Sequence, residues 1–254
     1  MTALSPFAGS TPALLLIESE PQAGDWNMAV DNWLLQRALS HELAAARIYR
    51  WREPTVSLGH FQKGDDPAVT GRFARLPRVR RLSGGGAILH DREITYSLAV
   101  PQHHPLAADP TGLYSVVHDR VIAVLEGLGI KSRMRGEALS GPEPFLCFGR
   151  GDPRDIVLGG NKILGSAQRR RRGAILQHGA LLLQRSPDAA EFPGIEELSG
   201  RVIDVPDLVE RLANAFGQLL GATDRRSRLD PSDEDEVRSH QRAADEEATG
   251  TPAS

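Results

Sequence analysis

The sequence predicts an α+β domain with a largely antiparallel, mixed sheet packed by helices. Short segments of alternating apolar and polar residues follow one another, with turn dipeptides such as Gly159-Gly160 and Arg172-Gly173 between them, as in β-hairpins. Only three long segments have helical periodicity, whereas a doubly wound fold would alternate strands and helices along the chain. The chain has 254 residues, 40% of them hydrophobic, which suffices for one large core. Because no repeat or long linker divides residues 13–222, we expect them to form a single domain.

The three predicted helices each place apolar residues three and four positions apart, which forms one buried stripe. They cover residues 24–40, 111–128 and 206–220. In the second helix, Thr111 can cap the first turn and Gly129 can end the last one.

Residues 94–100 give the clearest strand pattern, since Ile94 and every second residue after it are apolar up to Pro101. This period of two predicts a strand with one buried face. Further strands are predicted at residues 47–51, 55–58, 86–90, 155–158, 162–168 and 174–183.

Charge is unevenly distributed along the chain. Residues 223–254 contain nine acidic and five basic side chains, a net charge of -4, and no aromatic residue. Asp230 followed by Pro231 has the composition of a helix start. We therefore expect residues 223–254 to be an acidic extension with a short helix, then a disordered tail from Thr249 to Ser254, and residues 1–12 to be loose.

The composition argues against several classes of protein. A formal net charge of -3 provides no basic field for nonspecific nucleic-acid binding. A single cysteine forms no internal disulfide, and no apolar run approaches the roughly 20 residues of a membrane-spanning helix. The apolar stretch at residues 13–17 is too short for a secretory signal. We expect a cytoplasmic protein that binds neither nucleic acid nor a membrane.

A glycine-rich segment, Arg80–Ala87, is the sharpest local feature. Its three consecutive glycines leave a stretch of backbone without β-carbons, so a ligand can approach the main chain closely, and the arginines favour an anion or a polarised carbonyl. It matches neither the phosphate-loop nor the dinucleotide-binding pattern. From spacing alone, it is either a ligand loop or a plain glycine-rich connection.

Cys147 is the only thiol, and Lys162 follows it by 15 residues at a predicted turn before a strand. A cysteine between aromatic residues is commonly an inert small hydrophobe, and a lysine at a hairpin is commonly a solvated side chain. If the fold brings the two together, the ammonium group will stabilise the thiolate, which makes the thiol a nucleophile.

Two further features allow two interpretations each. The run Arg169–Arg172 is either a solvated hairpin end or a docking patch for an acidic carrier protein. His178 is either a buried, hydrogen-bonded histidine or a residue on the substrate side. We find no metal-ligand spacing and expect no metal site.

Taken in order, several motifs resemble those of the lipoate-protein ligase and octanoyltransferase family. They cover about residues 20 to 185 and comprise Asn27–Asp31, Thr55–Gly59, Arg80–Ala87, Thr95–Ser97, Lys162–Gln168 and Gln177–Gly179. The resemblance implies the catalytic domain shared with biotin protein ligases, in which a tunnel near the glycine-rich loop holds the acyl chain. Leu82 departs from the small or proline residue expected at its position, and nothing in the sequence explains its effect.

The family has two branches with different chemistry. Its ligases use ATP and Mg to form an acyl-adenylate. Its cysteine–lysine octanoyltransferases need no ATP, because they take octanoate from acyl carrier protein onto a cysteine. They then pass the acyl group to a lysine of a lipoyl domain or of the glycine-cleavage H protein. Cys147 and Lys162 stand where that branch has its cysteine and lysine.

Two departures from the ligase branch point the same way. The segment Pro153–Asp155 keeps only part of the Arg-Asn-Asp stretch of ligases, and the additional C-terminal domain of many ligases is not present in the sequence. The resemblance therefore implies an octanoyltransferase without a cofactor. An ATP-dependent lipoate ligase and a non-catalytic protein that binds lipoyl carriers are the alternatives.

The resemblance also assigns roles to individual residues. Cys147 would be the nucleophile, and Lys162 would stabilise the thiolate and orient the acyl carbonyl or the incoming amine. The triple glycine would aim backbone donors at the oxyanion. The residues expected to contact the substrate are Arg80, Arg81, Ser83, Gly84, Gly85, Gly86, Ala87, His90, Tyr96, Gly165, Ser166, Ala167 and His178. The run Arg169–Arg172 would suit the acidic carrier proteins.

Overall fold

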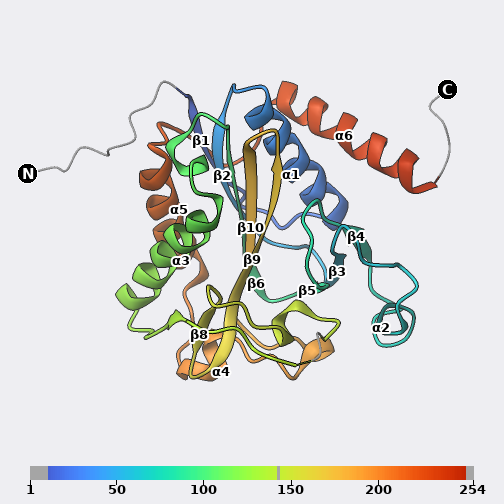
Figure 1. Ribbon diagram of the computed structural model, residues 1–254, viewed down its shortest axis with the longest axis vertical. Coiled ribbons are helices and arrows are strands. Elements are labelled where there is room, and N and C mark those ends of the chain that lie inside the picture. Colours follow the sequence, from blue (N-terminus) through green and yellow to red (C-terminus); the bar gives the residue numbers. More distant parts are fainter. Residues whose placement is uncertain (1–10, 142–143, 250–254) are drawn as a thin grey trace, which may run out of the picture.

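The computed structural model describes residues 11–141 and 144–249, and its centre is an eight-stranded mixed sheet (Figure 1). The strand order is β11-β1-β2-β6-β10-β9-β8-β7. The pairs β11–β1 and β1–β2 are parallel, and the other five are antiparallel. These strands are β1 (Ala13–Ile17), β2 (Ala44–Tyr49), β6 (Glu93–Val100), β7 (Arg133–Met134), β8 (Ile156–Leu158), β9 (Asn161–Arg171), β10 (Ala174–Leu182) and β11 (Asp224–Arg226). The largely antiparallel α+β architecture predicted from the sequence is confirmed.

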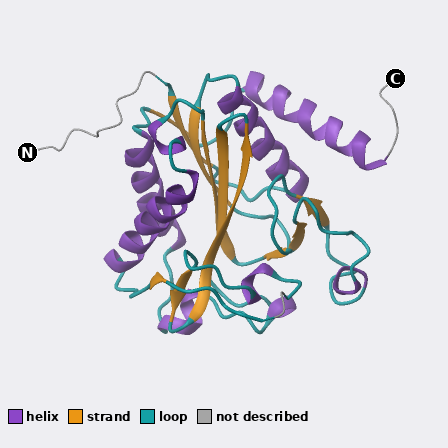
Figure 2. Ribbon diagram, viewed as in Figure 1, coloured by secondary structure: helices purple, strands orange, loops and turns teal. Residues whose placement is uncertain are grey.

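A second, three-stranded sheet has the order β4-β3-β5 and lies beside α1 (Figure 2). Its strands are β3 (Thr55–Leu58), β4 (Arg78–Arg80) and β5 (Ile88–His90). The helices are α1 (Gly24–Leu39), α2 (Pro67–Thr70), α3 (Pro110–Gly127), α4 (Ile195–Ser199), α5 (Val205–Leu220) and α6 (Pro231–Thr249), with 3-10 turns η1 (Pro105–Ala107), η2 (Cys147–Gly149) and η3 (Pro187–Ala189).

Helices cover both faces of the main sheet. Figure 1 shows α3 and α5 on one face and α1 on the other, with α6 outside α1. The prediction of a single buried face for residues 94–100 is therefore wrong, because all eight residues of β6 are buried. Polar side chains on the α1 face, such as Thr95 and Ser97, are tolerated there because they hydrogen-bond to Glu93 and Asp31.

Local signals explain the helices and hairpins that the sequence predicted. Both residues of the turns Gly159-Gly160 and Arg172-Gly173 have positive φ, as type I′ hairpins require. Asp109 rather than Thr111 caps α3, because its carboxylate accepts from the Thr111 and Gly112 N–H groups. The buried strand β1 was not predicted.

The C-terminal segment is more integrated than its composition suggested. The expected boundary between residues 222 and 223 does not separate it from the domain, because β11 pairs with β1. The expected short helix is the 19-residue α6, and its Val237 is fully buried against α1. The tail expected to be disordered lies outside the described residues from position 250 on. Among the described residues, none of the helices combines the length and apolar character that crossing a membrane requires.

Candidate active site

Cys147 opens the 3-10 turn η2 and lies against the end of the glycine-rich segment. Its backbone N–H donates to the Ala87 carbonyl over 2.7 Å, and the Ala87 N–H donates to the Phe145 carbonyl over 3.0 Å. These bonds fix the backbone of the cysteine relative to the loop. The thiol itself is half-buried.

The structure brings Lys162 next to this thiol, as the family resemblance implied. The Lys162 Nζ lies 3.9 Å from the Cys147 Sγ and 3.2 Å from the Cys147 carbonyl oxygen. Lys162 is 7% exposed, so the ammonium group acts on the sulfur with little solvent screening.

A carboxylate that sequence reasoning missed, Asp155, binds the same ammonium group. Its Oδ1 lies 2.9 Å from the Lys162 Nζ, and both side chains are buried. Burial raises the pKa of Asp155, and the Lys162 ammonium opposes that shift without cancelling it. Gly165 makes room for the pair, because a β-carbon at this position would lie 2.7 Å from the Lys162 Nζ.

Arg81 is the second buried cation of the site, and no carboxylate within the described part of the chain pairs with it. Its guanidinium donates to the carbonyls of Ser57 at 2.9 Å, Gly84 at 2.7 Å and Gly86 at 2.6 Å. Burial lowers the pKa of Arg81 to about 10, although the charge of Cys147 acts in the opposite direction. The loop curls around the guanidinium because Gly85 adopts a φ of 92°, which favours glycine.

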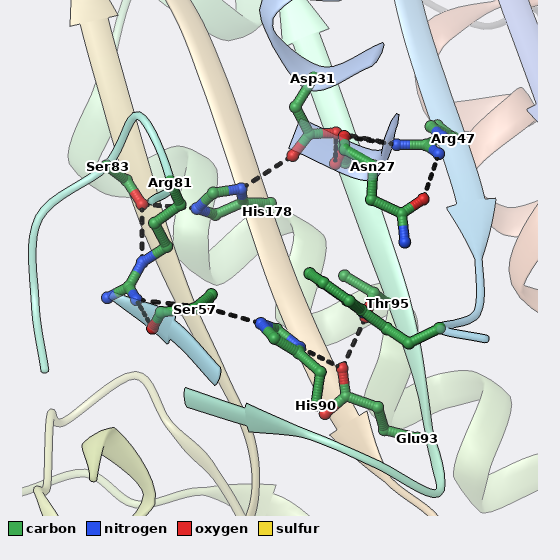
Figure 3. A network of polar contacts seen from close by, with 12 residues as sticks. Asn27, Asp31, Arg47, Ser57, Arg81, Ser83, His90, Glu93, Thr95 and His178 are labelled. Atoms are coloured by element: carbon green, nitrogen blue, oxygen red, sulfur yellow. Dashed lines mark hydrogen bonds and ion pairs between the residues drawn. The ribbon is translucent and has the colours of Figure 1, made fainter. Parts of the chain in front are cut away.

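A buried chain of hydrogen bonds fixes the position of the Arg81 side chain (Figure 3). The Arg81 Nε donates to the Ser83 hydroxyl, which is hydrogen-bonded to His178 Nε2, and His178 Nδ1 lies 3.0 Å from Asp31. Burial by itself would raise the pKa of Asp31, but the hydrogen bond from His178, the charge of Arg47 and the bond from Ser97 hold it below its usual value. With Nδ1–H donating to Asp31, His178 Nε2 accepts from Ser83, so every group in the chain is satisfied.

His90 is held in a second part of the same network (Figure 3). Its Nε2 lies 2.7 Å from the Ser57 hydroxyl and its Nδ1 lies 2.6 Å from Glu93. Trp51 stacks on the imidazole with ring centroids 3.8 Å apart and donates to Thr95. The orientation of His90 is therefore fixed on both edges and on one face.

These groups surround a narrow cavity of about 20 Å³, room for about one water molecule. Its lining consists of Met28, Tyr49, Trp51, Ser57, Arg81, Ile88, His90, Thr95, Ala167, His178, Gly179 and Ala180. Ala180 pairs across the sheet with Gly165, against which the Lys162 side chain packs. The end of the cavity at Ala180, on β10, therefore lies beside the residue of β9 against which the Lys162 side chain packs.

Two of the predicted contact residues lie elsewhere. The Tyr96 hydroxyl is 2.7 Å from the Ser166 hydroxyl, which is 2.6 Å from His118 Nε2 on α3. These hydrogen bonds lie on the opposite face of the sheet from the cavity. Successive residues of a strand point to opposite faces, and His178, which lines the cavity, is next to the residue of β10 that pairs with Tyr96. The strand alternation was visible in the sequence, but not which face carries the cavity.

The arginines also separate. Arg80 is exposed and donates to the carbonyls of Gly59, His60 and Gln62, whereas Arg81 is 2% exposed. Arg170, in the run Arg169–Arg172, lies eight residues along β9 from Lys162, about 26 Å at the rise of a strand. The structure does not bring that run to the thiol.

Known proteins of one family are similar to this chain. The model of the lipoyl protein ligase A/B catalytic domain matches residues 24–195. The chain is 31% identical to the octanoyltransferase LipM of Kyrpidia tusciae, over 86% of this chain and 89% of that protein, and 33% identical to that of Brevibacillus brevis, over 80% and 86%. A solved bipartite lipoate protein ligase of Thermoplasma acidophilum, described with its lipoyl domain, has the same fold. Its TM-score is 0.62 at 19% identity, over 96% of this chain and 98% of that one.

Proposed function

The chain belongs to the lipoyl protein ligase A/B catalytic-domain family and is an octanoyltransferase of protein lipoylation, and we propose that it works through a thioester on Cys147. The observation that carries this proposal is the 3.9 Å approach of the Lys162 Nζ to the Cys147 Sγ. Family membership supplies the reaction class, and this pair of residues supplies the nucleophile.

The charges around the thiol favour its ionised form. Lys162 and Arg81 are cations, and Asp155 is the carboxylate paired with Lys162. With Asp155 ionised, these three groups leave one positive charge in a largely buried site, and the Arg150 guanidinium also acts on Arg81 there; a thiolate at Cys147 offsets this positive charge. An unpaired buried charge is costly, so this arrangement stabilises the thiolate.

In the loading step, the thiolate attacks the carbonyl of an octanoyl thioester carried by acyl carrier protein. The new carbon–sulfur bond forms as the donor's carbon–sulfur bond breaks, and the carrier leaves as a thiolate that takes up a proton. One thioester replaces another, so the step needs no nucleotide. The Lys162 ammonium and the backbone of residues 84–86 are the groups available to stabilise the oxyanion.

In the transfer step, the amine of an acceptor lysine attacks the Cys147 thioester. An amide forms, Cys147 is released, and the proton that the amine loses balances the one that the thiolate regains. An amide is more stable than a thioester, so this step runs downhill without ATP. We infer that the acceptor is a lipoyl domain or the glycine-cleavage H protein and that no cofactor takes part.

We infer that the acyl chain enters the cavity beside these groups, although Leu146 and Phe148 line a second small cavity next to Cys147. The cavity is lined by Met28, Ile88, Ala167 and Ala180 and ends next to the lysine pair. Its volume of about 20 Å³ means that side chains such as Met28 must move aside for an eight-carbon chain. Burial of that chain contributes about 0.8 kcal/mol per methylene, which offsets this movement.

Intact-mass spectrometry tests the proposal. The wild-type protein, mixed with octanoyl carrier protein in the absence of ATP, is expected to gain one octanoyl group, and Cys147→Ala is expected to gain none. Addition of a lipoyl domain should discharge the adduct. Product formation from free octanoate and ATP with pyrophosphate release, surviving in Cys147→Ala, would instead identify a ligase.

A further inference from the structure

An exposed aromatic side chain stands beside the glycine-rich loop, and three cations lie near it along the chain or on β4. Phe61 is 83% exposed, and Lys63, Arg78 and Arg80 near it on the chain and on β4 are exposed as well. We call these four residues the Phe61 patch. Large apolar side chains that face water singly are common, so exposure alone assigns no role to Phe61.

The backbone that carries Phe61 is held firmly in place. A single Arg80 nitrogen donates to the carbonyls of Gly59 at 2.9 Å, His60 at 3.2 Å and Gln62 at 2.7 Å. The Gly59 N–H donates to the Gln62 side chain over 2.9 Å. Phe61 is therefore presented to solvent by a preorganised loop, which lowers the entropy cost of binding a partner.

The cations of the patch have no acidic partner within residues 11–141 and 144–249. Lys63, Arg78 and Arg80 form no ion pair there, whereas nearby Arg72 is paired with Glu191. Arg78 and Arg80 alternate with Val79 on the edge strand β4, so they project from the same side, about 7 Å apart. An aromatic side chain among unpaired cations is complementary to an acidic protein surface with an apolar centre.

The patch connects to the nucleophile through one short stretch of chain. The His60 N–H donates to the Ser83 carbonyl over 2.9 Å, and Ala87 accepts the N–H of Cys147. The four residue-to-residue steps from Ser83 to Ala87 span at most about 14 Å. The patch therefore lies within one loop of the reaction centre.

We propose that the Phe61 patch docks the acidic carrier protein that brings the octanoyl thioester, an inference that rests on the proposed function. A carrier that holds its thioester at the end of a long prosthetic arm can bind one loop away from Cys147. The acceptor presents its lysine on a side chain without such an arm, so we expect it to bind closer to the thiol. The arginine run 169–172, about 26 Å along β9 from Lys162, is too remote for either.

Steady-state kinetics with two donors test this docking. Phe61→Ala is expected to raise the KM for octanoyl carrier protein about tenfold, as removal of an interface anchor does. Lys63→Glu combined with Arg78→Glu is expected to raise it further and to weaken its dependence on salt. With octanoyl-coenzyme A, which has no carrier protein, the rate of Cys147 acylation should change less than twofold.

Matched controls separate this proposal from simpler explanations. Arg170→Glu repeats the charge reversal at the far end of β9, and Val202→Ala removes another exposed apolar side chain, 90% exposed in the folded protein; neither should change the carrier KM. An unchanged KM in the Phe61 patch variants would overturn the proposal. The exposed arginines would then serve only to keep the edge strand β4 from pairing with another chain. A rise in the KM of the lipoyl acceptor instead would overturn it too. Failure of both donors to acylate wild-type Cys147 would refute the proposed function itself.

Discussion

The two faces of the main sheet both carry buried polar networks, but only one of them ends in an unpaired charge. On the α1 face, the chain from Asp31 through His178 and Ser83 ends at the Arg81 guanidinium, which only carbonyls and hydroxyls bind. On the other face, Tyr96, Ser166 and His118 form a chain that ends at the Arg154 carbonyl.

The difference separates a reactive site from a structural network. A buried cation without a counterion costs folding free energy unless a ligand or a reaction intermediate neutralises it. A neutral network whose donors and acceptors are all matched needs no further partner. The comparison therefore predicts that substitutions on the α1 face change the reaction, whereas those on the α3–α5 face change stability.

The largest effect is expected for Lys162→Met, which removes the charge beside the thiol and keeps the length of the side chain. The rate of acyl transfer should fall about 10³-fold, within the range for loss of a general acid or electrostatic group. Because Asp155 is then buried without its cation, unfolding free energy should fall by about 3 kcal/mol. Single-turnover acylation and chemical denaturation measure the two effects.

A double variant separates the two roles. Lys162→Met with Asp155→Asn removes the unpaired carboxylate and should recover most of the lost stability. The acylation rate should stay low. Recovery of the rate in the double variant would contradict a direct role for Lys162.

Arg81→Met should have the next largest effect. Loss of this buried cation, which has no carboxylate partner among the described residues, is expected to slow acylation about 10²-fold. Arg81→Lys should retain part of the rate, because it keeps the charge but its compact ammonium group lacks the planar fork that reaches Ser57, Ser83 and the loop carbonyls together. Arg169→Met serves as the control at the far end of the sheet, and an equal loss there would show that the charge of Arg81 acts only at long range.

A selectivity change of about tenfold is expected for Ala167→Val, which narrows the cavity. One extra methylene against a pocket wall is worth 10- to 200-fold in discrimination, and two added methyl groups beside His178 should favour hexanoyl over octanoyl donors. The ratio of kcat/KM for the two donors measures this. Unchanged chain-length preference would place the acyl chain outside this cavity.

The sequence predicted those parts of the fold whose causes are local. Apolar spacing predicted α1, α3 and α5, and the dipeptides Gly159-Gly160 and Arg172-Gly173 predicted both hairpin turns. Strand β1 was missed because its partners β2 and β11 lie 30 or more residues away or at the other end of the chain. The pairing itself leaves no local signal, but the apolar run at residues 13–17 is typical of a buried strand and could have predicted β1.

The residues of the candidate site were also predicted only in part. The pairing of Cys147 with Lys162 was expected from the family resemblance, but the role of Asp155 was not. Regular pairing around the Gly159-Gly160 turn would place Asp155 opposite Leu164, and the register shift between Ile156 and Val157 alters that arrangement. Successive residues at the end of a strand point to opposite sides, so Arg80 points outward and Arg81 points inward. This alternation is visible in the sequence and could have predicted that only one of the two arginines is buried.

The smallest effect on the reaction is expected on the α3–α5 face, from His118→Gln. An amide can donate to the Arg154 carbonyl and accept from Ser166, so acyl transfer should change less than twofold. Burial lowers the pKa of His118 from 6.5 to about 4. Between these values the unfolded chain binds more protons than the folded one, so unfolding free energy falls as the pH drops through this window. The His118 contribution amounts to about 2 kcal/mol between pH 7 and pH 5, and His118→Gln should abolish it in denaturant titrations at the two pH values.

His178→Gln is the matched change on the α1 face, where it breaks the hydrogen-bond chain that fixes Arg81 and should slow acylation. If the two glutamine variants slowed the reaction equally, the two faces of the sheet would not differ in function.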